Sequence, residues 1–116
     1  MRGRHLSRTA SHRKALRQNL TNSLFTHGRI ITTLEKAKET KSFAEKIITV
    51  AKNGLLMKDT DKPGYVHCYR QVLARLRNAD VTRKLFGEGL WRETGGIAKR
   101  FVNRNGGYTR ILKLSG

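Results

Sequence analysis

Acidic residues are absent from both ends of this 116-residue chain, and that distribution constrains its fold more than any other feature of the sequence. Residues 1–29 carry seven Lys and Arg and no acid, and residues 99–116 carry five and none. The whole chain has 25 basic and 8 acidic residues, a net charge of +17. Because such an excess repels itself in a compact state, the two ends are expected to contact a polyanion. The mixed-charge middle is expected to form the folded part.

Nucleic acid is the first partner that this charge predicts, and an anionic membrane surface is the second. No apolar run approaches the roughly 18 residues of a transmembrane helix. The basic N-terminus is not followed by the apolar stretch of a secretory signal. The single cysteine, Cys68, excludes an internal disulfide framework and a multi-cysteine zinc site. We therefore expect an intracellular nucleic-acid binder of one domain.

The N-terminal third is predicted to be an arm followed by a helix. Residues 1–10 lack periodic apolar residues, so we expect an extended basic arm that is disordered without a partner. Residues 11–27 have Leu16, Leu20 and Leu24 on one stripe, which predicts a helix. Ser11 is the expected N-cap, and Gly28 is the expected end.

A strand and a second helix are predicted next. The β-branched run at residues 30–33 is typical of a short strand, and residues 32–35 (TTLE) fit a capping box. The helix after it should end at Asn53-Gly54, near Lys52. Its expected buried stripe consists of Ala37, Ala44, Ile47, Ile48 and Ala51.

The second half of the chain is predicted to hold further helices and another strand. Residues 55–64 are expected to be a loop, 65–77 a third helix, and 80–86 a short fourth helix that Asp80 caps and Gly87 ends. Residues 87–96 suggest an irregular loop, and residues 97–105 have no clear pattern. From Gly107 onward, one set of residues alternates along the chain with Thr109, Ile111 and Lys113, a period of two that predicts a strand; that set is Tyr108, Arg110, Leu112 and Leu114. The expected fold is α+β: three main helices packed on a small mixed sheet, with the arm at 1–10 and a single RNA-binding domain at 11–116.

Signals for catalysis are missing from the sequence. The four histidines and Cys68 form no ligand set with metal-binding spacing, and adjacent His67 and Cys68 point about 100° apart on a helix. Neither phosphate-loop pattern is present, and no carboxylate pair suggests acid–base chemistry. We therefore expect no enzyme, cofactor, metal or small-molecule substrate. The aromatics form no base-stacking platform, which favours recognition of phosphates and shape.

Several segments resemble a known family in family order. They are residues 11–16 (SHRKAL), 27–34 (HGRIITTL), 36–39 (KAKE), 44–49 (AEKIIT), 84–86 (KLF) and, most specifically, 105–114 (NGGYTRILKL). Together they resemble bacterial-type ribosomal protein seventeen of the large subunit.

The resemblance implies a structural protein with a compact α+β domain that binds large-subunit ribosomal RNA near the nascent-chain tunnel exit. It implies neighbouring large-subunit proteins as further partners, and a ribosome of the bacterial cytoplasm or of an organelle as the location. The residues expected to contact RNA are the basic arm, the start of the first helix and the C-terminal motif: Arg2, Arg4, Arg8, His12, Arg13, Lys14, Arg17, Arg29, Lys99, Arg100, Arg104, Tyr108 and Arg110.

The chain departs from the family pattern in three places. Residues 54–64 are longer than usual, and residues 91–96 are an insertion. Family members continue past Leu114 into another strand, so an exposed sheet edge is expected to need cover. A DNA-binding architectural protein of the nucleoid type is the alternative function, although no wedge or recognition helix is evident. A cationic membrane-active helix at 11–27 is a third reading, with a narrow apolar face.

The start of the first helix is the most specific candidate site. Its free N–H groups and positive dipole favour an anion, and His12, Arg13, Lys14 and Arg17 surround it. No acid occurs within the first 34 residues to neutralise these cations locally. Arg13 and Arg17, four residues apart, are expected to bracket RNA phosphates.

Overall fold

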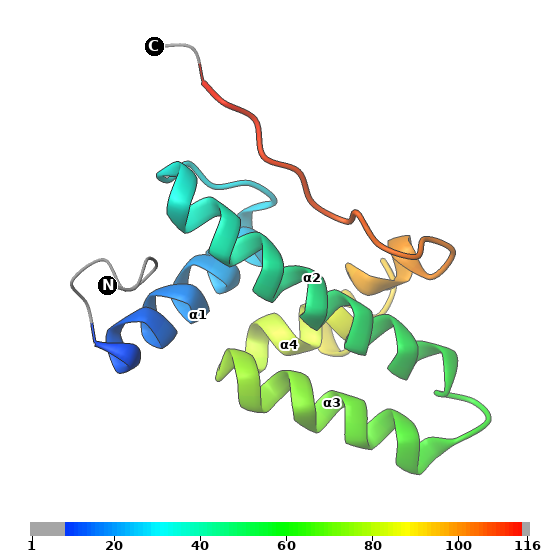
Figure 1. The fold of residues 1–116 in the computed structure, drawn as a ribbon. Coiled ribbons are helices and arrows are strands. Elements are labelled where there is room, and N and C mark those ends of the chain that lie inside the picture. The colour runs from blue at the N-terminus through cyan, green and yellow to red at the C-terminus, as the bar shows by residue number, and fades with distance from the viewer. Residues whose placement is uncertain (1–8, 115–116) are drawn as a thin grey trace.

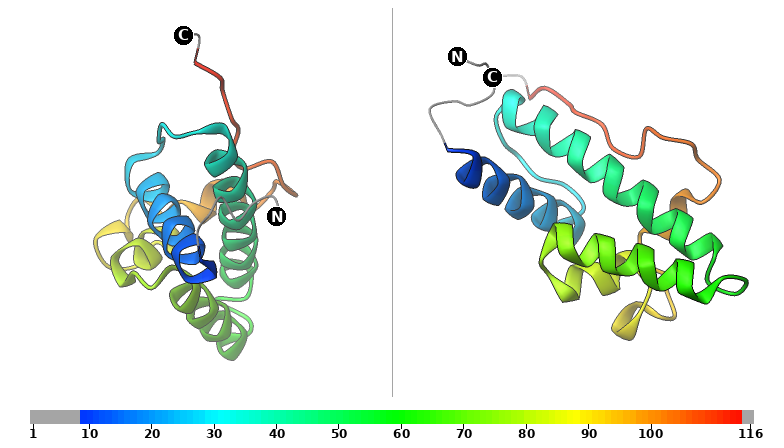
Figure 2. Two further views of the ribbon diagram at one scale, coloured as in Figure 1. Left: turned by 60° about the vertical axis from the view of Figure 1, so that its left-hand side comes forward. Right: turned by 60° about the horizontal axis from the view of Figure 1, so that its bottom comes forward.

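A computed structural model of the chain describes residues 9–114 and shows helices arranged around one long central helix (Figure 1). The α-helices are α1 (Ala10–His27), α2 (Leu34–Leu56), α3 (Lys62–Leu76) and α4 (Ala79–Phe86). Two short 3₁₀ helices follow, η2 (Gly89–Trp91) and η3 (Ala98–Phe101). Helix α2 packs against α1, α3, α4 and η3, so it organises the whole domain. After η3 the chain extends along α2 to Leu114 (Figure 2).

The predicted α+β fold with a mixed sheet is wrong, because residues 9–114 contain no strand. Residues 30–33 are an extended link between α1 and α2. Residues 107–114 are extended, but they run beside a helix rather than a second strand. A strand needs backbone partners on a neighbouring strand. Here the Thr109 N–H donates instead to the Glu45 carboxylate on α2, at 2.8 Å.

Three helices have a different N-cap from the one predicted, so α1 and α4 begin earlier than predicted and α2 begins one residue later. Thr9 caps α1 by accepting a hydrogen bond from the His12 N–H, in place of Ser11. Asn78 caps α4 through the Val81 N–H, in place of Asp80. At α2 the cap is Thr33, which accepts from the Lys36 N–H. Thr9 and Asn78 each lie two positions before the predicted cap, and Thr33 lies one position after the predicted start of the capping box. Differences of one or two residues are usual at helix ends.

The glycines at the ends of α1 and α4 behave as predicted, whereas Gly54 does not. Gly28 and Gly87 end their helices with φ of 85° and 76°. Gly54 lies inside α2, which continues to Leu56, and it is buried. A Cβ at Gly54 would lie 2.8 Å from the Cys68 Cβ and 3.1 Å from the Phe86 ring. The missing side chain therefore lets α2 approach α3 closely, rather than ending the helix.

The apolar core lies between α2, α3 and α4. Its largest fully buried side chains are Phe86, Ile47, Ile48, Leu76, Leu85 and Val72. The Phe86 ring packs edge-on against Tyr65, with centroids 5.7 Å apart, and lies 4.9 Å from the Tyr69 ring. Burial of this apolar surface is the main source of stability.

Helix α1 contributes less to that core than its leucines predicted. Leu16, Leu20 and Leu24 are only half-buried, whereas Thr21 and Phe25 of the adjacent face are buried. The face that meets α2 therefore changes from polar near the N-terminus of α1 to apolar near its C-terminus.

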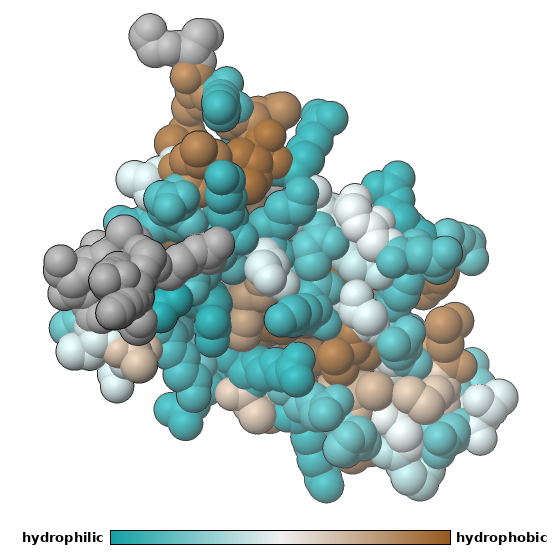
Figure 3. Space-filling view, in the orientation of Figure 1, coloured by the Kyte–Doolittle hydropathy of each residue, from teal (hydrophilic) through white to brown (hydrophobic). Residues whose placement is uncertain are grey.

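Exposed apolar side chains gather at one end of the domain, where the C-terminal segment passes the start of α2 (Figure 3). They include Ile31, Leu34, Leu112 and Leu114, which are between 41% and 73% exposed.

A candidate nucleic-acid interface

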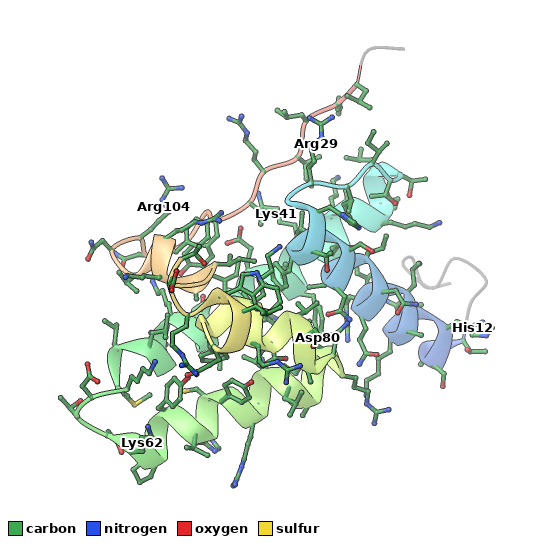
Figure 4. The ribbon with its side chains drawn as sticks, turned by 180° about the vertical axis from the view of Figure 1, so that it is seen from behind. His12, Arg29, Lys41, Lys62, Asp80 and Arg104 are labelled. Carbon is green, nitrogen blue, oxygen red and sulfur yellow. The ribbon has the colours of Figure 1, made fainter. Side chains whose placement is uncertain are left out.

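The residues predicted to contact RNA fall into three groups by exposure. Arg2, Arg4 and Arg8 lie outside the described residues. Arg13 and Arg17 are half-buried, and Tyr108 is buried. The others are exposed, and Figure 4 shows three of them, His12, Arg29 and Arg104, well separated on the surface. The exposed set consists of His12, Lys14, Arg29, Lys99, Arg100, Arg104 and Arg110.

Four of the exposed cations belong to one stretch of chain at the end of the domain. Lys99 and Arg100 lie on η3, whose neighbouring Ala98 is fully buried. Arg104 follows in the next turn, and Arg110 lies on the extended segment. We call these four residues, Lys99, Arg100, Arg104 and Arg110, the C-terminal basic group. Its members come from a segment with no acidic residue of its own, and all four side chains are exposed, so they are available to attract an anion.

The buried Lys52 of α2 fixes the turn that carries Arg104. Its ammonium donates to the Arg104 carbonyl and lies 5.2 Å from the centre of the Tyr108 ring. The Tyr108 hydroxyl accepts from Thr49 and donates to the same Arg104 carbonyl, both at 3.3 Å. Tyr108 packs on Phe101 with centroids 5.1 Å apart. Its ring therefore positions the turn and does not face solvent, where a base could stack on it.

Glu45 of α2 holds the next residue of this segment. Its carboxylate accepts from the Thr109 N–H at 2.8 Å and from the Thr109 hydroxyl at 2.7 Å. Burial alone would raise the pKa of Glu45, but the hydrogen bonds from Thr109 and Tyr108 and the charge of Lys41 together hold its pKa below the usual value. The ionised carboxylate thus anchors the base of the extended segment.

Sequence reasoning missed these anchoring residues. Glu45, Thr49 and Lys52 are spaced four and three apart, so they form one polar stripe on α2. That polar stripe could have predicted a contact between this face of α2 and another segment of the chain.

An acidic residue from elsewhere in the chain neutralises the start of α1. Arg13 donates to Glu39 of α2 at 2.9 Å, and the two side chains are 26% and 21% exposed. The Arg17 guanidinium lies 4.6 Å from the centre of the Phe43 ring, also on α2. Arg13 and Arg17 therefore face α2, while His12 and Lys14 point to solvent. Adjacency in sequence did not reveal Glu39, which lies 26 residues after Arg13.

The contact between α1 and α2 leaves several buried polar atoms unpaired. We call it the α1–α2 seam: Arg13 and Arg17 of α1 contact Glu39 and Phe43 of α2 across it. Thr21 follows Arg17 by about one turn of α1, and Thr40 directly follows Glu39 on α2. Thr21 is fully buried and Thr40 is 3% exposed, yet neither hydroxyl has a hydrogen-bond partner. The Nε atoms of Arg13 and Arg17 are also buried without a partner. Such orphaned groups normally indicate strain or an unfilled site.

An open groove lies beside the turn that Lys52 fixes. It measures about 490 Å³, and its lining includes the cations Lys46 and Arg75, the acidic Glu45, and Asn105 and Gly106. Its two cations extend the positive surface next to Arg104. Within residues 9–114 no three His, Cys, Asp or Glu side chains cluster as metal ligands would. No described helix is both long and apolar enough to span a bilayer.

Comparison with known proteins identifies one family. Residues 16–116 match the family described as ribosomal protein L17. The chain is 48% identical over 111 residues to the large ribosomal subunit protein bL17 of Desulfotalea psychrophila, covering 96% of this chain and 72% of that protein. It is 46% identical to bL17 of Trichlorobacter lovleyi, covering 97% and 76%, and 44% identical to bL17 of Allorhizobium ampelinum, covering 96% and 66%. These relatives are longer than this chain.

Proposed function

This chain belongs to the ribosomal protein L17 family and is thus a structural protein of the large subunit of bacterial-type ribosomes, and we propose that it acts by binding large-subunit ribosomal RNA through phosphate contacts. The resemblance predicted from the sequence, and the location on a bacterial-type ribosome, are confirmed by the family match. The phosphate contacts and the residues that make them are the part proposed here.

The C-terminal basic group is the observation that carries the proposal. Its four cations are exposed, and Glu45 and Lys52 hold the backbone between them in place. A fixed set of cations loses less conformational entropy on binding than the same cations on a loose tail. Arg side chains also donate in a planar fork that suits phosphate. His12 and Lys14 at the start of α1, and Arg29 just after its end, supply further contacts.

The family resemblance supports the finer parts of the proposal. It favours a position near the exit of the nascent-chain tunnel, with other large-subunit proteins as neighbours. It also favours a scaffolding role without catalysis, cofactor or small-molecule substrate, since the family is structural. The DNA-binding alternative is not favoured, because the family that the chain matches is ribosomal.

Salt dependence of RNA binding tests this function. The protein should bind an in-vitro transcript of large-subunit ribosomal RNA with a log–log salt slope of about −0.7 to −0.9 per phosphate contact. Changing Arg100 and Arg104 to Gln should flatten that slope by about 1.5 and weaken binding.

The matched control removes the same charge elsewhere. Arg70 and Arg92 are exposed on α3 and after η2, so changing both to Gln alters net charge equally. The control should retain the parent slope. Equal flattening by both double variants would show that only net charge matters, and salt-independent binding by the parent would refute phosphate recognition.

A further inference from the structure

Two of the six asparagines in this chain precede a glycine, in the pairs Asn53-Gly54 and Asn105-Gly106. The backbone nitrogen that follows an asparagine can attack the side-chain amide, and a glycine at that position allows the attack because it has no side chain to obstruct it. Both asparagines are exposed, so exposure does not distinguish them. The difference lies in the backbone to which each glycine belongs.

Gly54 is held in a helix, whereas Gly106 is not. Gly54 lies inside α2, where its N–H belongs to the helical hydrogen-bond ladder, and a Cβ there would lie 2.8 Å from the Cys68 Cβ. Gly106 lies in the turn after η3, and its N–H donates no hydrogen bond to any residue in the described part of the chain. A Cβ at Gly106 would meet nothing within 4 Å. The backbone at Gly106 is therefore free to approach the Asn105 side chain.

The charge around this turn favours the same reaction. The pair at 105–106 lines the open groove together with Lys46 and Arg75, and Arg104 directly precedes it. Positive charge nearby stabilises a backbone nitrogen that has lost its proton, and also the oxyanion that forms when this nitrogen attacks a carbonyl carbon. Glu45 lines the groove as well, but its carboxylate already accepts hydrogen bonds from the extended segment.

We propose that Asn105 is a site of spontaneous deamidation, which converts a neutral turn into an anionic one. The Gly106 nitrogen loses its proton to hydroxide and attacks the Asn105 Cγ, so that a new C–N bond closes a cyclic imide. The bond from Cγ to Nδ2 breaks, and ammonia leaves with a proton from water. Water then opens the imide at either of its carbonyl carbons, which gives aspartate or isoaspartate. The sum consumes water and releases ammonia, and nothing is oxidised or reduced.

The new carboxylate lies next to the C-terminal basic group. It directly follows Arg104, so it competes with RNA phosphates for that guanidinium. Isoaspartate also adds a main-chain carbon between Arg104 and Tyr108, which Lys52 holds in place. The effect on RNA binding rests on the proposed function, whereas the chemistry of the turn does not.

Peptide mass spectrometry of the purified protein, fresh and after ageing in solution, tests the reaction. The peptide that contains Asn105 should gain the mass that replacement of –NH₂ by –OH gives. The peptide that contains Asn53 should react at least about tenfold more slowly, because α2 must first open there. Equal rates at the two sites would overturn the proposal. So would an unmodified Asn105 after a time in which a synthetic peptide of residues 103–108 has reacted.

RNA binding by the aged protein tests the consequence. Aged parent protein should bind the ribosomal RNA transcript roughly three- to tenfold more weakly than fresh protein, which is the scale of one lost phosphate contact. Fresh Asn105→Asp should show the same loss. Asn105→Gln should keep its affinity on ageing, because its longer side chain would have to close a larger ring.

Asn53→Gln is the matched control, since it removes the other Asn-Gly pair. It should lose affinity on ageing as the parent does. An equal loss in Asn105→Gln, or parent affinity in Asn105→Asp, would overturn the link between this turn and RNA binding. A parent protein that never binds the transcript would instead refute the proposed function and would leave the mass-spectrometric result standing, so the two failures are distinguishable.

Discussion

Helix α2 packs against α3 and α4 in one way and against α1 in another, and the contrast separates a stabilising core from a weaker contact. Toward α3 and α4 it buries Ile47 and Ile48 against Phe86, and Gly54 lets the helices come close. Toward α1 it offers Glu39, Thr40 and Phe43, and the seam there retains unpaired donors. Each buried group left unpaired costs about 1–3 kcal/mol, which offsets much of what the seam contributes.

The comparison teaches that one helix can belong to a rigid core on one face and to a weak contact on another. Local opening in proteins begins where buried apolar contacts are few. We therefore expect α1 to exchange its amide hydrogens faster than α3, although both lie against the same helix.

The largest expected effect comes from breaking the core side of this comparison. Phe86→Ala removes a fully buried ring that contacts Tyr65 and Tyr69. The free energy of unfolding should fall by about 3–5 kcal/mol, the usual range for such a cavity. Urea denaturation followed by circular dichroism measures it. A loss below about 1 kcal/mol would mean that the α2–α3–α4 core does not dominate stability.

The second prediction sharpens the comparison with a polar contact that is fully paired. The pKa of Glu45 is lower in the folded protein than in the unfolded chain, where a glutamate has a pKa of about 4.3. The hydrogen bonds that Glu45 accepts from Thr109 therefore stabilise the fold fully above about pH 4.3. That stabilisation is lost as the pH falls through the lower pKa of the folded state. The Thr109 amide resonance should shift with a midpoint below 4.3 in an NMR titration. Glu45→Gln should abolish that shift and should leave α1 unaffected. A midpoint above 4.3 would contradict the anchoring role.

The smallest expected effect lies within the seam. Arg17→Lys keeps the charge but removes the flat guanidinium from the Phe43 ring. The cation–aromatic contact should be worth about 0.5–1 kcal/mol, measured with Phe43→Leu in a double-mutant cycle of urea denaturation. A coupling energy as large as the loss expected for Phe86→Ala, about 3–5 kcal/mol, would show that the contact of α2 with α1 is as strong as its contact with α3 and α4.

Sequence periodicity predicted the four α-helices, because apolar residues three and four apart must share a face wherever the chain is helical. The same reasoning failed for residues 30–33 and 107–114. Alternation shows only that a segment is extended, and a sheet requires a partner that no local pattern reports. The basic candidates were correctly identified as cations, but their exposure depended on tertiary contacts. Glu39 reaches Arg13 only because α2 folds back against α1, and Tyr108 is buried only because Lys52 and Phe101 surround it.

The anchoring of Thr109 has a consequence for how the rest of the C-terminal segment meets a partner. Residues 110–114 start from a fixed point, so their fully extended reach is about 17 Å. Confinement to a sphere of about that radius corresponds to an effective concentration on the order of tens of millimolar for Lys113, and Arg110, directly after the anchor, is confined more closely still. Once Lys99 and Arg100 of η3 have bound RNA, Arg110 and Lys113 would be held close to neighbouring phosphates by the short chain that links them to Thr109. Their contacts then form without a further loss of translational freedom, and Glu45 sets the length of the tether.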